Sequence, residues 1–467
     1  MVLIDRQQDV RVNIIIIGAG TVGFALAEYL NKYRHHISVI ETDTALCDQI
    51  NSKLDVFTVN AKGSSPASLK AAGIQDADMI IAATPDVETN LLVCNFAKQY
   101  GVESRIARVK SGEFTSGETG IDLGELGVTH VVEPEKEVVK SIIQYIELPG
   151  VIETANFQSD NVYLRGYKVT ESMPLANKTL AEINKLASPA PMLIVVIFRD
   201  GKSITPTGAE RLLPDDQIVA IMPRESFNTF RQLLGKNSEK VKKVIISGDT
   251  LTALDLADAC KPFAERTILV DPDEQHGVLA ASKLEGIEVL HGDCTNTEML
   301  QEIHIENTDF FIAAGEDTED NVMSCLLSKA EGAAEVIAVN NTDRHERLFQ
   351  SLGLDHIINP RKITAQRIIS SILRMPISAH LGLEKADIQV TRFIAEKKSK
   401  IIGKPLQEFK EIFKRSIVIG AVMRGDHVII PRGDTIILAD DEVLVLCQSS
   451  SHKFAGRLFK AGVSLSV

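Results

Sequence analysis

The sequence predicts an α/β protein built by tandem duplication, in which each half carries a Rossmann-like, doubly wound parallel sheet followed by a small α+β domain. Three observations lead to this fold class. Strand-length apolar runs alternate with helical stretches, a glycine-rich fingerprint follows the first apolar run, and the same anchors recur about 230 residues later. The chain of 467 residues is too long for one hydrophobic core. We therefore expect four domains, at residues 1–135, 136–240, 241–361 and 362–467.

The duplication is visible as short segments that return in the same order. The run Ile14–Gly18 matches Val244–Gly248. Further matches pair residues 39–41 with 269–271, 77–83 with 308–314, 86–90 with 317–321, 130–134 with 356–360, and 198–201 with 423–425. The spacing drifts by only about five residues along the chain, and the order never breaks. Chance similarity does not keep so many anchors collinear.

The first α/β domain alternates strands with helices. We expect a strand at residues 12–17, whose last four residues are all isoleucine, as is typical of a strand buried on both faces of a sheet. We expect further strands at residues 37–40, 56–59, 79–83, 105–109 and 128–132, and helices at residues 18–30, 65–72 and 88–100. Pro66 favours the start of the second helix, and Gly101 favours the end of the third.

A proline-bracketed linker helix follows each α/β domain. Pro134 and Pro149 bracket a helix at residues 135–146, and Pro360 and Pro376 bracket its equivalent in the second half. Such a helix is either a plain connector or a lever that carries motion between domains, and both interpretations stay open.

The small domains, at about residues 151–235 and 380–460, have a different pattern. In the first we expect strands at residues 162–168, 194–198 and 218–221, and a helix near residues 179–186. Asp200-Gly201 lies between two of these strands and predicts a hairpin, and Gly425-Asp426 stands at the same place in the second half.

The fingerprint runs from Gly18 through Gly20, Thr21 and Val22 to Gly23. It follows a buried strand and opens a helix, which is the context that dinucleotide binding requires. The first glycine permits the tight turn, the second lets a pyrophosphate approach the backbone, and the third permits close packing of the helix on the sheet. The helix N-terminus then supplies N–H donors and the positive end of a dipole.

An acidic residue follows about 20 residues later, at the end of the second strand. Glu41 occupies this position, where a carboxylate accepts hydrogen bonds from ribose hydroxyls and repels a 2′-phosphate. NAD is therefore favoured over NADP. Asp43 is a nearby competitor for the same role.

Further polar residues follow other strands, at the edge of the sheet where ligands bind. Ser64 and Thr84 are candidates for contacts with ribose or phosphate. The cations Arg105, Arg108 and Lys110 lie on or just after the fifth strand, and Arg108 or Lys110 is placed to reach a terminal phosphate. A solvated surface is the alternative for each cation.

The second half departs from this pattern at the decisive positions. Its candidate residues are Gly248, Asp271 and Asp293, but Thr250 and Ala253 replace the second and third glycines of the fingerprint. Val339 stands where the first half has Arg108. This second site binds a different nucleotide, binds weakly, or is structural, and we favour weakened or altered binding.

Composition and motifs exclude several classes of function. The net charge is −13 and no basic run occurs, which argues against nucleic acid as a partner. No apolar run approaches the roughly 20 residues of a membrane-spanning helix, and no signal peptide is visible, so we expect no membrane insertion. The six cysteines form no CxxC pair, and no metal-binding or catalytic motif is present. We therefore expect neither a metal site nor catalytic residues, and a sensor in place of an enzyme.

The fingerprint, Glu41, the segment 76–84 with Asn90, and residues 105–108 are together similar to an RCK domain (regulator of potassium conductance). The segment 131–134 and the end of the first small domain, residues 208–216, fit the same family. Two copies in one chain resemble the cytosolic regulatory subunits of bacterial Trk potassium uptake systems, and this resemblance covers almost the whole chain.

The resemblance implies ligands and partners that composition does not show. NAD(H) and ATP or ADP would bind in the first α/β domain, at Gly18, Gly20, Gly23, Glu41, Ser64, Thr84 and Arg108. Four chains would assemble into a homo-oligomeric ring in the cytoplasm. The ring would dock peripherally at the inner face of the cell membrane, under a potassium-translocating subunit of the TrkH type.

The mechanism follows as a hypothesis. ATP and ADP differ by the γ-phosphate, so a cation at the rim of the site is the natural discriminator, and we choose Arg108. Two other readings stay open: an NAD-dependent oxidoreductase, and a nucleotide-sensing regulator of another membrane transporter such as an antiporter.

Overall fold

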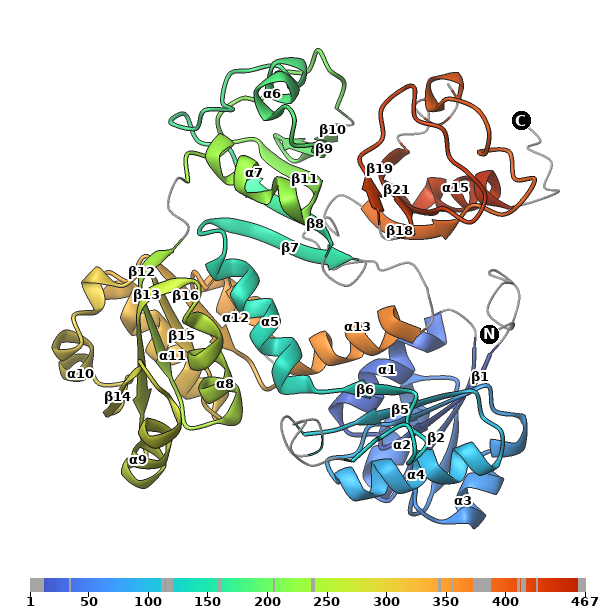
Figure 1. Cartoon of the computed structure of the whole chain (residues 1–467). Coiled ribbons are helices and arrows are strands. Elements are labelled where there is room, and N and C mark those ends of the chain that lie inside the picture. The colour runs from blue at the N-terminus through green and yellow to red at the C-terminus, as the bar shows by residue number, and fades with distance from the viewer. Residues whose placement is uncertain are drawn as a thin grey trace. The chain divides into compact units, whose positions relative to one another are not determined.

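The computed structural model describes residues 12–32, 35–110, 114, 121–157, 161–204, 206–236, 240–342, 346–354, 356–372, 388–409, 412, 417–425 and 427–460. The chain divides into two compact units (Figure 1). One unit contains both α/β domains and comprises Met1–Ile143 and Lys242–Leu373; the other contains both antiparallel domains and comprises Gln144–Val241 and Arg374–Val467. Each unit therefore combines corresponding parts of the two halves of the sequence.

The first α/β domain has the strand order of a Rossmann fold. Its parallel sheet runs β3-β2-β1-β4-β5-β6, so the order reverses between β1 and β4. The strands are β1 (Asn13–Ile17), β2 (His36–Glu41), β3 (Phe57–Asn60), β4 (Met79–Ala82), β5 (Ser104–Arg108) and β6 (His130–Val132). The predicted strands are confirmed within a residue or two at each end. The apolar runs of the central strands β1 and β4 are buried in the sheet.

Helices pack on this sheet through their apolar residues. They are α1 (Thr21–Lys32), α2 (Thr44–Lys53), α3 (Pro66–Ala71), the 3₁₀ turn η1 (Ile74–Asp76) and α4 (Val87–Gln99). Leu69 of α3 and Val93 of α4 join Ile15 and Ile17 in one hydrophobic cluster, so α3 and α4 cover one face of the sheet. Helix α2 was not among the predicted elements.

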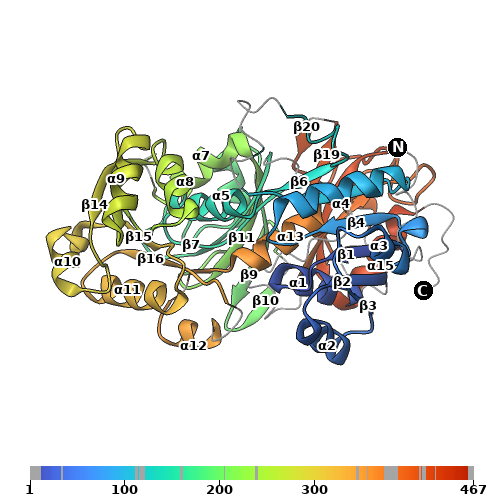
Figure 2. The same ribbon diagram turned by 90° about the horizontal axis from the view of Figure 1, so that it is seen from below.

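The linker helices are α5 (Pro134–Ile146) and α13 (Pro360–Ile372). Both begin at the predicted proline, whereas Pro376 lies outside the described residues. Helix α13 belongs to the second half of the sequence but packs against α1 of the first α/β domain (Figure 2). Arg367 of α13 also pairs with Glu137 of α5, with Nε and Oε1 3.4 Å apart.

The second α/β domain repeats the first. Its sheet has the order β14-β13-β12-β15-β16-β17, with parallel pairing from β12 through β15 and β16 to β17 and between β13 and β14. The strands are β12 (Val241–Ser247), β13 (Ala264–Asp271), β14 (Glu288–His291), β15 (Phe310–Ala313), β16 (Glu335–Val339) and β17 (His356–Ile358). The helices are α8 (Leu251–Cys260), α9 (Glu274–Lys283), α10 (Thr297–Glu302), η3 (Ile305–Asn307), α11 (Thr318–Ala330) and α12 (Glu346–Ser351).

The first small domain is an antiparallel sheet of order β10-β9-β11-β8-β7. Its elements are β7 (Val151–Phe157), β8 (Val162–Lys168), α6 (Leu180–Ala187), β9 (Leu193–Arg199), β10 (Lys202–Ile204), β11 (Gln217–Pro223), η2 (Arg224–Ser226) and α7 (Phe227–Leu233). Asp200 and Gly201 have φ of 51° and 72°, as the left-handed turn of a two-residue hairpin requires. The predicted hairpin is thus confirmed.

The second small domain has a sheet of order β18-β21-β19-β20. Its elements are β18 (Ile388–Ile394), η5 (Leu406–Glu408), β19 (Val418–Arg424), β20 (His427–Ile429), β21 (Glu442–Gln448), η6 (Ser449–Ser451) and α15 (His452–Phe459). Leu164 and Ile221 of the first small domain share a hydrophobic cluster with Ala421 and Leu444 of the second. Gly420 permits the close approach, since a Cβ there would lie 2.6 Å from Ile221 Cδ1.

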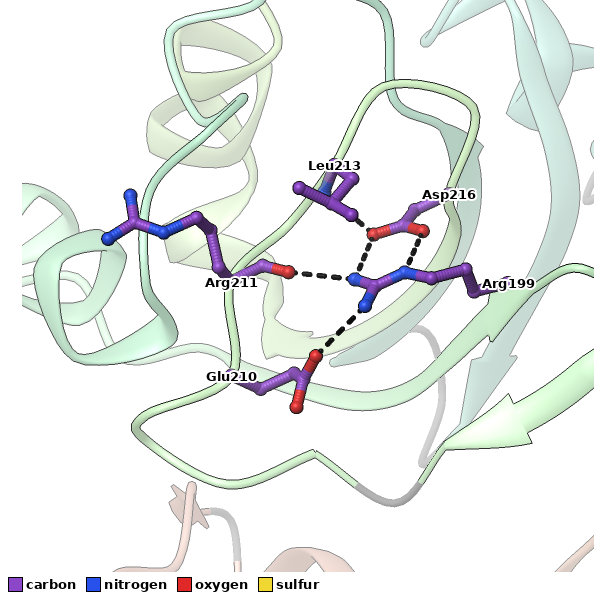
Figure 3. A network of polar contacts seen from close by, with 5 residues as sticks. All are labelled: Arg199, Glu210, Arg211, Leu213 and Asp216. Carbon is purple, nitrogen blue, oxygen red and sulfur yellow. Dashed lines mark hydrogen bonds and ion pairs between the residues drawn. The ribbon is translucent and has the colours of Figure 1, made fainter.

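Each small domain is fixed by an arginine–aspartate pair under the loop that precedes its last strand. Arg199 donates from Nε and Nη2 to both oxygens of Asp216, each at 2.8 Å, and Nη2 also donates to the Arg211 carbonyl (Figure 3). Asp216 is 1% exposed and also accepts the N–H of Leu213. This hydrogen bonding raises the pKa of Arg199, against the opposing effect of burial.

The same network recurs in the second copy. Arg424 donates to both oxygens of Asp441 at 2.8 Å and to the Ile436 carbonyl, and Leu438 donates its N–H to Asp441. Since the network survives in both copies, it belongs to the fold of the small domain. No helix in the described part of the chain has the length and apolarity to cross a bilayer.

We predict that Arg199→Ala destabilises the first small domain by about 3 kcal/mol, because it leaves a buried carboxylate without its cation. The readout is the urea dependence of amide hydrogen exchange in β9 and β11. The control is Arg266→Ala, which removes an exposed pair with Glu288 and should change stability by less than about 0.5 kcal/mol. Equal stability of the two variants would contradict this role of Arg199.

Candidate nucleotide-binding site

The end of β1 enters α1 through a turn that only glycines allow. Gly18 has a left-handed φ of 96°, and its N–H donates to the Ile40 carbonyl of β2 at 2.8 Å. A Cβ on Gly23 would lie 1.8 Å from the Gly18 carbonyl oxygen. Without a side chain at Gly23, the first turn of α1 packs directly on the end of β1. The third glycine of the fingerprint, Gly23, therefore permits the close packing of α1 on the sheet, as predicted.

The space in front of Gly20 is open. A Cβ there would meet no heavy atom within 4 Å. Within the described residues, no side chain caps α1, so the first N–H groups of Thr21 and Val22 remain available. Unpaired N–H donors at the positive end of a helix dipole favour an anion such as a pyrophosphate.

Glu41 ties the end of β2 to this turn. Its Oε2 accepts the Ala19 N–H at 2.6 Å, and its Oε1 accepts the N–H groups of Thr42 and Asp43 at 2.6 and 2.9 Å. Burial alone would raise the pKa of Glu41, but these donors together lower it, so the carboxylate is ionised at neutral pH. Asp43 instead caps α2, accepting the Ala45 N–H at 2.8 Å. Of the two acids, Glu41 is the one beside the fingerprint.

The loop after β3 reaches the same edge of the sheet. A Cβ on Gly63 would lie 2.1 Å from Ile17 Cγ2, so the loop passes directly over the end of β1. The single Ser68 hydroxyl proton is shared between the Lys62 and Ser65 carbonyls, which lie 2.5 and 2.8 Å from Ser68 Oγ, and this contact holds the loop. This geometry places half-buried Ser64 at the fingerprint end of the sheet.

The loop after β4 also contacts the fingerprint. Thr84 Cγ2 lies 3.3 Å from where a Cβ on Gly18 would stand. The Thr84 hydroxyl donates to Asn90 Oδ1 at 2.7 Å, and Asn90 Nδ2 donates to the carbonyls of Thr84 and Arg108 at 2.9 and 2.8 Å. Asn90 is fully buried. It therefore joins the ends of β4 and β5, a role the sequence pattern alone did not assign to it.

The three predicted cations separate in the structure. Arg108 is half-buried at the end of β5. Burial lowers the pKa of its guanidinium; nearby Glu135 of α5 raises that pKa and Arg361 of α13 lowers it. Lys110 is exposed. Arg105 lies on β5, as expected, but near the start of the strand, where it donates to the carbonyls of Gly127, Val102 and Glu103.

The second α/β domain keeps the hydrogen bonds between its strand ends but has different residues at the site. Asn321 donates to the carbonyls of Gly315 and Val339, both at 2.9 Å, as Asn90 does in the first domain. Asp271 is fully buried and lies 2.5 Å from His276 Nδ1. Asp293 accepts the N–H and hydroxyl of Thr295 at 2.8 and 2.7 Å. His276 was not among the predicted site residues.

Two known domain families match this chain. The TrkA-N domain model matches residues 14–134 and 244–360, and the TrkA-C domain model matches residues 164–235 and 390–458. The chain belongs to the TrkA family. The two TrkA-N domains are the α/β domains described above, and the two TrkA-C domains lie within the small antiparallel domains.

Relatives span nearly the whole chain. The "Trk system potassium uptake protein TrkA" of Azorhizobium caulinodans is 28% identical over 455 residues, which is 96% of this chain and 99% of that protein. The protein of the same name from Vibrio alginolyticus is 28% identical over 444 residues, 94% of this chain and 96% of the relative. The similarity therefore spans nearly the full length of both relatives and of this chain.

Solved structures share the fold. The GsuK RCK domain crystal structure has a TM-score of 0.59 at 19% identity and covers 97% of this chain and 96% of its own. The GsuK channel bound to NAD has a TM-score of 0.60 at 19% identity, with 98% of this chain and 80% of that chain covered. The tandem α/β and antiparallel fold predicted from the sequence is confirmed.

We predict that Gly23→Ala destabilises the first TrkA-N domain by about 1–3 kcal/mol or more, because the new methyl group collides with the Gly18 carbonyl. Gly20→Ala, three residues away on open space, should change stability by less than about 0.5 kcal/mol. Thermal unfolding of the two variants beside the wild type measures the difference. If Gly23→Ala were tolerated as well as Gly20→Ala, the close packing of α1 on β1 would be wrong.

Proposed function

We propose that this chain is a nucleotide-sensing regulatory subunit that gates a TrkH-type potassium uptake channel or transporter through NAD(H) and ATP or ADP. The observation that carries the proposal is the open space before Gly20, beneath an uncapped helix N-terminus and beside Glu41. A diphosphate fits this chemistry, with Glu41 available to a ribose. The NAD-bound GsuK channel and the TrkA relatives support the ligand and the transport system.

The proposed subunit acts by binding and not by chemistry. Four chains form a ring in the cytoplasm, held at the inner face of the membrane by the translocating subunit. Nucleotides gate the transporter only if they bind the conformations of the ring with different affinity. A coupling free energy of roughly 1–3 kcal/mol would change opening about 5–150-fold.

Arg108 is the proposed discriminator between ATP and ADP. It is half-buried, and Glu135 and Arg361 both influence its pKa. These two residues lie in the first turns of the linker helices α5 and α13. A γ-phosphate near Arg108 competes with Glu135 for the cation and attracts Arg361. Binding of ATP would thereby change the electrostatic environment at the start of both linker helices, which then act as levers.

We predict that Arg108→Ala removes most of the difference between ATP and ADP in affinity, a loss of roughly 10-fold or more, since a hydrogen bond to a charged group contributes about 1.5–3 kcal/mol. Calorimetric titration of the variant and the wild type with each nucleotide measures this difference in affinity. The control is Lys110→Ala, which removes an exposed cation two residues away. Unchanged discrimination in Arg108→Ala, or its loss in Lys110→Ala, would move the role away from Arg108.

The whole proposal is tested by co-expressing the chain with a TrkH-type subunit in cells that lack other potassium uptake. We expect potassium influx to depend on the chain, and flux in proteoliposomes to respond differently to ATP and to ADP. Incubation with NADH should show stoichiometric binding without turnover. Steady oxidation of NADH with a substrate would instead establish an oxidoreductase. Copurification with an antiporter alone would redirect the proposal to another transporter.

A further inference from the structure

We infer that each chain takes up one dinucleotide, in the first TrkA-N domain, and that the second TrkA-N domain is closed to it by its own side chains. The inference rests on the proposed function of the first site and adds which of the two sites works. The residues that close the second site are Thr250 and His276, assisted by Asn341. Every position in question has a counterpart in the first domain, so the chain supplies its own comparison.

Thr250 fills the place that Gly20 leaves open. Its side chain accepts the Ala253 N–H at 3.2 Å and so caps α8, the counterpart of α1. Its hydroxyl also donates to the Ala314 carbonyl at 2.6 Å. The Ala253 N–H, in the first turn of α8, therefore donates to a side chain of the protein and is not available to donate to a phosphate oxygen. The hydroxyl links the loop after β12 to the loop after β15, between which a pyrophosphate would pass.

These two loops are closer together than their counterparts. In the first domain, a Cβ on Gly18 would lie 3.5 Å from the Ala83 carbonyl carbon and 3.4 Å from Thr84 N. In the second domain, a Cβ on Gly248 would lie 2.7 Å from both equivalent atoms, Ala314 C and Gly315 N. The backbone therefore leaves less room beside Gly248 than beside Gly18.

The acid that should hold a ribose is also occupied. Asp271 has no exposed surface, and His276 Nδ1 lies 2.5 Å from its Oδ2, while Oδ1 accepts the Asp273 N–H at 2.9 Å. In the first domain, apolar Leu46 stands at the position of His276 in the equivalent helix. Glu41 there is only half-buried, and although Oε1 accepts three hydrogen bonds, Oε2 accepts one, from the Ala19 N–H. A ribose reaching Asp271 would have to displace an imidazole from a buried carboxylate, which is unfavourable.

The charged side chains around the second site also disfavour a diphosphate. Asp293 stands where the first domain has Lys62, and Val339 where it has Arg108. Asn341, the counterpart of Lys110, donates from Nδ2 to the carbonyls of Gly315 and Glu316 at 3.1 and 3.0 Å. Three cations are thus lost, one anion is gained, and the Asn341 amide bridges the loop after β15. A polyanion would meet repulsion where the first site offers attraction.

The test is calorimetric titration of the full chain with NADH, using variants that place the same side chain in each half. Gly20→Val fills the open space of the first site, and Thr250→Val keeps the volume of the second. We expect one equivalent of NADH per wild-type chain, loss of at least 100-fold in affinity for Gly20→Val, and unchanged stoichiometry and affinity for Thr250→Val. In a second matched pair, we expect Glu41→Gln to weaken NADH binding and Asp271→Asn to leave it unchanged. This pair keeps the test valid if one variant of the first pair misfolds.

The possible outcomes separate this inference from the function it rests on. Two equivalents of NADH in the wild type, or one retained in Gly20→Val together with Glu41→Gln, would overturn it while leaving a nucleotide-binding regulator intact. Loss of binding in Thr250→Val or Asp271→Asn with a preserved fold would also overturn it. Absence of NADH binding to the wild type would overturn the proposed function and this inference together.

Discussion

The contact of Gly23 with the Gly18 carbonyl is the constraint on which the candidate site depends. A Cβ at Gly23 would stand 1.8 Å from that oxygen, so the packing of α1 on β1 exists only because the side chain is absent. This packing directs the N-terminus of α1 over the end of the sheet. The loops after β2, β3 and β4 then reach the same point, through Glu41, Gly63 and Thr84. Ala253 stands at the position of Gly23 in the second domain and is fully buried, so that copy accommodates a methyl group there.

The duplication separates what the fold needs from what the site needs. Asn90 and Asn321 make equivalent hydrogen bonds between neighbouring strand ends, and the Arg199 and Arg424 networks are repeated almost bond for bond. These contacts persist in both copies because removing them would leave buried polar groups without partners. Replacing Gly20, Lys62 or Arg108 does not leave a buried polar group of the fold without a partner. They are the positions at which the copies diverge, as expected if one copy has been released from binding a ligand.

Much of this could be predicted from sequence, for identifiable physical reasons. Four of the five residues of β1 are consecutive isoleucines, and Asp200-Gly201 specifies its turn by backbone conformation. Helix α2 was missed because only Cys47 and Ile50 of its ten residues are buried, which leaves no apolar stripe. The hydrogen bonds of Arg105 to the carbonyls of Gly127, Val102 and Glu103 could not be predicted, because the position of a residue on a strand does not tell toward which end its long side chain extends. The pairing of His276 with Asp271 depends on side-chain geometry, although their spacing across a helix start was a usable signal.

The position of Arg108 gives a physical reason for retaining the second copy even if, as we propose, its own site is closed. Helix α13 comes from the second half and packs on α1, the helix that opens at the first site. It also brings Arg361 near Arg108, where the equivalent residue of α5 is Glu135. The two linker helices thus present opposite charges to one guanidinium. A change in anionic charge at that guanidinium shifts the balance between them in opposite senses, attracting α13 and releasing α5. A single binding site suffices for this response, provided that both halves supply a linker helix.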